Sequence, residues 1–182
     1  METKAIVLGI LALGLVIVLG SGAYAYDAMP TPEGMGLDYS ITAGAVFSVN
    51  SDVDNSARPA IGFSWYGPAE PAFGDMAAFG LSAAWLGLRR NDGKDVQLAP
   101  VTLNYKRSAI LGGYRVFVAL GLGIWYATDN IPAMKIDTGA SFAWTGGVGL
   151  DFTNTVFGQA MFYGGQNPGQ DGMVSISLGY RF

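Results

Sequence analysis

Apolar residues alternate with small or polar residues along most of the chain, with the period of two that is typical of β-strands. The pattern is clearest in residues 116–126, where Val118 and Leu120 share one parity and Gly121 and Trp125 share the other. Eight segments of this kind follow one another, at residues 39–47, 61–66, 76–88, 96–106, 116–126, 140–151, 156–164 and 172–182. The sequence therefore predicts an all-β fold with eight strands.

Short segments rich in Gly, Pro, Asn and Asp separate these strands, as in Asp92-Gly93 and Thr153-Asn154-Thr155. Such connections favour antiparallel strands that run up and down in sequence order. Pro100 predicts a weak position or a bulge in the fourth strand, because proline has no backbone N–H to donate. The alternation in 156–164 does not distinguish the two faces of that strand.

The last strand, residues 172–182, ends on an aromatic residue. Small or polar residues stand between its apolar positions, which are Val174, Ile176, Leu178, Tyr180 and Phe182. This ending resembles the C-terminal strand of bacterial outer-membrane β-barrels. The resemblance implies that these five residues are an assembly signal for the barrel assembly machinery, and that the last strand closes the barrel against the first.

The chain begins with the pattern of a helical signal peptide. Lys4 precedes an apolar run at 5–19, and Ala23-Tyr24-Ala25 provides a small-residue cleavage site. We expect cleavage after Ala25, with an uncleaved inner-membrane anchor as the alternative. The predicted organisation is a signal peptide at 1–25, a short linker at 26–37 and a barrel at 38–182.

Physical constraints favour closure of these strands into a transmembrane barrel. A bilayer has no water for unpaired backbone groups, so strands that cross it must leave no open edge. Glycines fall on the presumed inner parity of several strands, where a small barrel curves tightly. Aromatic residues lie near the strand ends as two candidate interfacial girdles, at Tyr39, Trp65, Tyr105, Tyr180 and Phe182 on one rim and at Phe47, Trp85, Tyr126 and Phe142 on the other.

Placing both termini at the periplasmic rim assigns the connections. The periplasmic turns are then 67–74, 107–113 and 153–155, and the external loops are 48–58, 89–95, 127–138 and 165–171. The external loops are rich in carboxylates, which basic residues partly offset, at Arg58, Arg89, Arg90, Lys94 and Lys135.

In its pattern from residue 38 to residue 182, the chain resembles the small eight-stranded outer-membrane barrels, a group that includes the OmpA transmembrane domain, OmpX and OmpW. The resemblance implies a location in the bacterial outer membrane and contact with its lipid bilayer. Members of the group serve as membrane anchors, as adhesion surfaces or as narrow channels for small apolar molecules.

Composition removes several classes of function. The chain has no cysteine, which excludes disulfides and thiolate metal sites, and no histidine, the usual general base near neutral pH. Lys106 and Ser108 form only a weak Ser-Lys pattern, and Asp52 to Asn55 lack the glycine and distal glutamate of an EF-hand calcium loop. We therefore expect no enzymatic activity, no metal or other cofactor, and no nucleic-acid partner.

Five charged residues fall on the inward parity near the periplasmic rim, namely Asp38, Lys106, Arg115, Asp151 and Arg181. Because an isolated buried charge is strongly disfavoured, we expect them to pair with one another. They would form either an ion-pair network that plugs the lumen or a gate or selectivity ring.

Phe117 and Trp125 also lie on the inward parity, and Leu86 can join them. They predict either a packed apolar core in the upper lumen or a pocket for a small hydrophobic molecule. The favoured function is thus an integral outer-membrane barrel with a largely filled lumen, acting as a structural or surface-interaction protein. The alternatives are a narrow channel or carrier for small hydrophobic molecules and a soluble lipocalin-like binding barrel.

Overall fold

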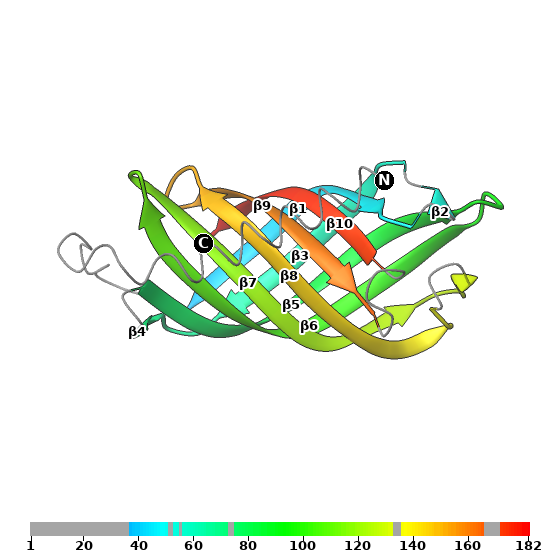
Figure 1. The fold of residues 1–182 in the computed structure, drawn as a ribbon, viewed down its shortest axis with the longest axis horizontal. Coiled ribbons are helices and arrows are strands. Elements are labelled where there is room, and N and C mark those ends of the chain that lie inside the picture. The colour runs from blue at the N-terminus through cyan, green and yellow to red at the C-terminus, as the bar shows by residue number, and fades with distance from the viewer. Residues whose placement is uncertain (1–36, 51–52, 55, 73–74, 133–135, 166–171) are drawn as a thin grey trace.

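The computed structural model describes residues 37–50, 53–54, 56–72, 75–132, 136–165 and 172–182 (Figure 1). The predicted signal peptide at 1–25 lies outside the described residues, as do most of the linker at 26–37 and of the loop at 165–171. Within the described part of the chain, no helix is long and apolar enough to cross a membrane.

Eight long antiparallel strands form a closed barrel in sequence order (Figure 1). They are β1 (Asp38–Ser48), β3 (Arg58–Tyr66), β5 (Asp75–Arg90), β6 (Asp95–Leu111), β7 (Tyr114–Ala127), β8 (Gly139–Asp151), β9 (Val156–Gly164) and β10 (Gly172–Arg181). Each strand pairs with its neighbours, and β10 pairs with β1 to complete the ring. This arrangement confirms the predicted all-β, eight-stranded, up-and-down barrel.

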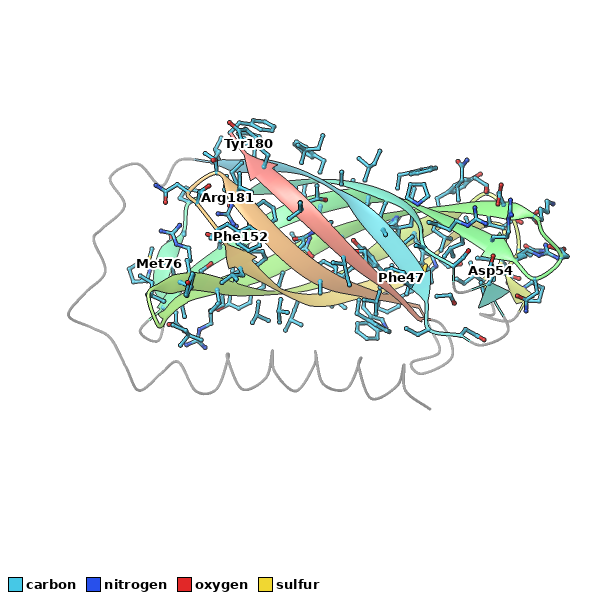
Figure 2. All side chains as sticks on the ribbon, turned by 90° about the horizontal axis from the view of Figure 1, so that it is seen from above. Phe47, Asp54, Met76, Phe152, Tyr180 and Arg181 are labelled. Carbon is cyan, nitrogen blue, oxygen red and sulfur yellow. The ribbon has the colours of Figure 1, made fainter. Side chains whose placement is uncertain are left out.

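The seam between β1 and β10 defines the two ends of the barrel. Ser40 pairs with Arg181 at one end, where the Phe182 N–H also donates to the Tyr39 carbonyl at 3.1 Å. We name this end the terminal rim and the opposite end, which carries Asp54, the distal rim. In Figure 2 the two rims lie at opposite ends of the long axis, with Arg181 at one and Asp54 at the other.

The connection between β6 and β7 is shorter than predicted. The sequence indicated a turn at 107–113, but β6 continues through Leu111 and only two residues, Gly112 and Gly113, form the turn. Their φ angles are 58° and 86°, which glycine adopts without steric cost. Two such glycines allow a two-residue hairpin whose twist matches that of the flanking strands, so the strands extend further than the alternation showed.

Two segments predicted as loops contain short strands. β2 (Val53–Asp54) pairs with the end of β5, and β4 (Glu70–Ala72) pairs with its beginning. Both additions follow from the length of β5, whose 16 residues exceed the nine of β3 and leave backbone groups at each end for a further partner.

Pro100 interrupts hydrogen bonding without creating a bulge. β5 and β6 pair at Ala83 with Val101 and again at Leu86 with Leu98, in the same register on both sides of the proline. No pairing to β5 is formed at Pro100 itself, because its nitrogen carries no hydrogen.

The outer surface is a belt of large apolar side chains. On β7, Leu120, Leu122 and Ile124 are each more than half exposed, and the same holds for Ile176 and Leu178 on β10. A belt of this extent on a closed barrel is the surface that a bilayer covers. A soluble lipocalin-like barrel would place its large apolar face inward, so the outward belt contradicts that alternative.

Aromatic rings collect where this belt meets the terminal rim. The Phe182 ring stacks against Tyr39 with centroids 6.4 Å apart and also lies 6.4 Å from Tyr180, and Tyr39 contacts Phe63 at 6.5 Å. Tyr39, Tyr180 and Phe182 belong to the interfacial girdle predicted at this rim, where amphipathic aromatic side chains are favoured, and Phe63 adds a further ring.

Candidate functional site

The lumen is the candidate functional site, and its chemistry changes steadily along the barrel axis. From the terminal to the distal rim, the inward-facing residues of β6 are Lys106, Asn104, Thr102, Pro100, Leu98 and Val96. Those of β10 change in the same order, as Arg181, Gly179, Ser177, Ser175 and Met173. The lumen therefore has a charged layer, a polar layer and an apolar layer.

The charged layer contains the five charged residues that the sequence analysis placed inside the barrel. Arg181 binds Asp151 with two hydrogen bonds of 2.7 Å, and its Nε lies 3.6 Å from Asp38. Lys106 Nζ lies 2.5 Å from Asp38, whereas Arg115 approaches Asp151 only to 3.9 Å. The two carboxylates and three cations thus form one connected cluster across the lumen.

Aromatic rings surround this cluster. The Lys106 ammonium lies 4.0 Å from the Tyr66 ring centroid, and the Arg181 guanidinium lies 4.6 Å from that of Phe157. The Phe117 ring packs edge-on against Phe157 at 5.7 Å. Cation–π contacts of this kind partly replace the solvation that buried cations lose.

Phe117 does not lie with Trp125 and Leu86, as a common apolar pocket would require. Eight residues separate Phe117 from Trp125 on β7, which corresponds to about 26 Å of extended strand. Phe117 belongs to the charged layer, whereas Trp125 and Leu86 lie together in the apolar layer. The three residues therefore share an inward parity but not a site.

Asn104 is the centre of the polar layer. Its Nδ2 donates to Ser82 at 2.8 Å, and its Oδ1 accepts from the Thr145 hydroxyl at 3.2 Å. Thr102 joins the group through its hydroxyl, which lies 2.9 Å from that of Ser82. Gly121 leaves room for this network, because a Cβ there would overlap both Asn104 and Thr145.

This polar network was not predicted from the sequence. Each of its members is an unremarkable small polar residue, and 41 positions separate Asn104 from Thr145. Their shared inward parity was the available signal, but the contacts also depend on strand register.

The apolar layer occupies the distal half of the lumen. Leu86, Leu98 and Trp125 are almost completely buried, and Ile131 and Ile136 from the β7–β8 connection pack in the same cluster. The cluster is completed by further side chains from around the ring, among them Val46, Val53, Leu88, Val96, Met161, Tyr163 and Met173.

Ion pairs cover the apolar layer at the distal rim. Asp129 binds Lys94 and lies 4.0 Å from Arg90, which in turn binds Asp92 at 2.8 Å. The bond from Lys94, followed by that from the Asn130 backbone N–H, lowers the pKa of the Asp129 carboxyl. Four of the basic residues predicted at this rim thus pair with a carboxylate, namely Arg58, Arg89, Arg90 and Lys94.

Arg107 and Asp75 form a second ion pair near the terminal rim, with Nε and Oδ2 2.6 Å apart. Both side chains are largely buried, although their parity is that of the outward face. This pair was not predicted from the sequence, because the two residues lie 32 positions apart and both fall outside the predicted strands at 76–88 and 96–106. Among the described residues, no group of three or more carboxylate, histidine or cysteine side chains is arranged to hold a metal ion.

Comparison with solved structures agrees with this architecture, whereas no protein-family model and no curated protein matches the sequence. The outer membrane enzyme PagL superposes with a TM-score of 0.54 at 18% identity, covering 80% of this chain and 98% of PagL. Ail of Yersinia pestis gives 0.48 at 15% identity, covering 80% and 99%, and OprG of Pseudomonas aeruginosa gives 0.44 at 14%, covering 81% and 97%.

A closed barrel of eight antiparallel strands, with an apolar belt outside and a polar to apolar lumen inside, defines an integral membrane protein. The chain has the fold of the small eight-stranded outer-membrane β-barrels. At these levels of identity, the structural similarity concerns the fold and not the activity of the compared proteins.

Proposed function

We propose that this protein is a non-enzymatic outer-membrane barrel whose lumen is closed and whose distal rim is a surface for contacts outside the membrane. The supporting observation is the succession of three filled layers in the lumen. The charged layer pairs both of its carboxylates with cations, the polar layer bonds to itself, and the apolar layer contains the almost completely buried Leu86, Leu98 and Trp125.

The apolar layer is the main barrier to ions in this proposal. An ion that enters from the terminal rim exchanges water for charged and hydroxyl groups, but the next layer offers no such ligands. A hydrophobic constriction blocks conduction because water and ions are both excluded from it. Closure would therefore persist even if the charged cluster were altered.

The absence of enzymatic activity is proposed from the side chains in the lumen. The chain has no histidine, and the hydroxyls of Ser82 and Thr102 bond to each other and to Asn104. Ser40 and Ser64 likewise bond to each other at 2.7 Å. A nucleophilic hydroxyl requires a neighbouring base, and these hydroxyls have hydroxyl or amide neighbours instead.

Single-channel recording in planar bilayers tests the closed lumen. At 0.1 M KCl, we expect no stepwise current from the wild type, nor from the variant with Arg181→Met and Arg115→Gln, because the apolar layer is intact in both. Currents in the wild type would contradict the proposal. Currents in the variant alone would identify the charged cluster as a gate.

A second candidate function is a carrier for small hydrophobic molecules, and Trp125 favours it. Its indole N–H is buried within the apolar layer and donates to no group in the described structure. A bound molecule with an apolar body and one acceptor atom would satisfy that donor. Transfer of a hydrophobic dye into proteoliposomes, compared between wild type and Trp125→Phe, tests this candidate. Equal transfer by protein-free liposomes would exclude it.

A further inference from the structure

The described parts of the β7–β8 connection lie over the distal end of the lumen, and they make different contacts on their two sides. Ile131 and Ile136 face the apolar layer, are only 1% and 2% exposed, and pair with each other through backbone hydrogen bonds of 2.7 and 3.2 Å. We name the described parts of this connection, residues 128–132 and 136–138, the strap.

The strap has internal order of its own. The Asn130 Oδ1 atom accepts hydrogen bonds from both the backbone N–H and the hydroxyl of Thr138, at 2.6 and 2.7 Å. At its start, the Thr128 N–H donates to the Gln97 carbonyl at 3.0 Å. The Asn130–Thr138 and Ile131–Ile136 bonds thus lie within the strap, whereas the Thr128 contact holds its start to β6.

The polar side of the strap is attached to the β5–β6 hairpin. Asp129 pairs with Lys94 and Arg90, and Arg90 Nη1 donates to the Asn130 carbonyl at 3.3 Å. These contacts are solvent-accessible, so their strength depends on salt and on each partner. They connect the strap to the longest hairpin of the barrel, which projects beyond its neighbours at the distal rim (Figure 1).

We infer that the strap is a releasable lid on the distal lumen and that the contacts of Asp129 with Lys94 and Arg90 are its latch. With the latch formed, Ile131 and Ile136 stay in the apolar layer and the lumen is closed. Loss of the latch shifts the population toward a state in which both isoleucines leave the cluster and the apolar layer is exposed to the outside. This inference rests on the proposed closed lumen and adds that the lumen is closed only while the latch is formed.

Thiol accessibility tests the lid, and the chain has no cysteine to interfere. The Ile131→Cys protein in lipid vesicles is reacted with a water-soluble maleimide at 0.1 M KCl. We expect slow labelling that rises about threefold when Asp129→Asn is added, because exposed ion pairs stabilise weakly. High salt should raise the labelling rate of the protein that keeps Asp129 more than that of the protein with Asp129→Asn.

Asp137→Asn is the matched control, because Asp137 lies on the strap, is exposed and takes part in no ion pair of the described structure. Its labelling rate should equal that of Ile131→Cys alone. Ile136→Cys provides a second reporter in case the first position tolerates substitution poorly. An unchanged rate with Asp129→Asn at both reporters, or an equal rise with Asp137→Asn, would overturn the inference.

Conductance separates this inference from the proposed function. Wild-type currents would contradict the closed lumen itself, whatever the labelling rates. If the wild type gives no current and its labelling rate does not depend on the latch, the closed lumen is supported and the lid is contradicted.

Discussion

At the scale of single residues, the stability of the lumen depends on complete pairing of its buried charges. Asp151 is almost fully buried and takes two hydrogen bonds from Arg181, whereas Arg115 is partly exposed and more distant. Removal of one partner of a buried pair leaves an unsolvated charge, which costs far more than loss of an exposed contact. The two arginines should therefore differ strongly in their effect.

Arg181→Met should lower the free energy of unfolding by about 3–5 kcal/mol, since it leaves Asp151 buried without its bidentate partner. Arg115→Gln should lower it by about 1 kcal/mol or less. Urea titration of the protein in lipid vesicles, followed by tryptophan fluorescence, measures both. Similar losses from the two substitutions would show that the charged layer is hydrated.

Gly121 provides a test of the polar layer, because the side chains of Asn104 and Thr145 occupy the place of its missing Cβ. Gly121→Ala places a methyl group against Asn104 and Thr145, and we expect a loss of about 1–3 kcal/mol from overpacking. Gly87→Ala is the matched control, because its added Cβ would meet its nearest neighbour at an ordinary 3.4 Å. The same urea titration compares them, and equal stability of the two variants would contradict the network.

The Asp129 carboxyl should titrate below the ordinary aspartate value of 3.8, because its bond from Lys94 and then that from the Asn130 N–H favour the charged form. A lowered folded-state pKa means that the stabilisation is present above 3.8 and is lost as the pH falls through the lowered value. Carbon-detected NMR of the side chain measures this midpoint. A midpoint at or above 3.8 would show that the Lys94 contact is not formed in solution.

At the scale of the elements, the strands were largely predictable and their ends were not. On β7 and β10 the large outward residues are exposed on the apolar belt and the inward residues face the lumen, so the alternation determines both faces. The ends of β5 and β6 do not show this alternation, because charged residues and glycines occur there in place of alternating apolar and polar residues. The strap was also unpredictable, because Ile131 and Ile136 stand in a loop pattern and reach the core only through the tertiary fold.

The Gly112-Gly113 turn restricts which residue types can occupy it, because both of its residues have positive φ angles. Gly113→Val should destabilise the barrel by about 1–2 kcal/mol, because a β-branched residue is strained at positive φ. Gly113→Asn should be tolerated better, since asparagine enters that region readily. Folding of the two variants into lipid vesicles, measured as yield and unfolding midpoint, distinguishes them. Equal behaviour would contradict the two-residue turn.

At the scale of the whole molecule, the position of the charges in sequence was sufficient to predict the charged layer, since parity and rim were both known. Prediction of the polar network around Asn104 would have required the register of β6 against β5 and also that of β7 and β8. The separation of Phe117 from Trp125 along the axis could have been estimated from strand rise alone. The three layers of the lumen could not be predicted as a whole, because they depend on the placement of all eight strands together.

The most direct test of the account is a paramagnetic NMR experiment on the protein in lipid nanodiscs, with one nitroxide probe confined to the lipid tails and another dissolved in water. If the closed barrel is embedded in the bilayer, the lipid probe broadens the methyl signals of Leu122, which is 64% exposed on the outer face, and neither probe broadens those of the fully buried Leu98. Broadening of Leu98 by the aqueous probe, or no broadening of Leu122 by the lipid probe, would contradict a closed barrel embedded in the bilayer.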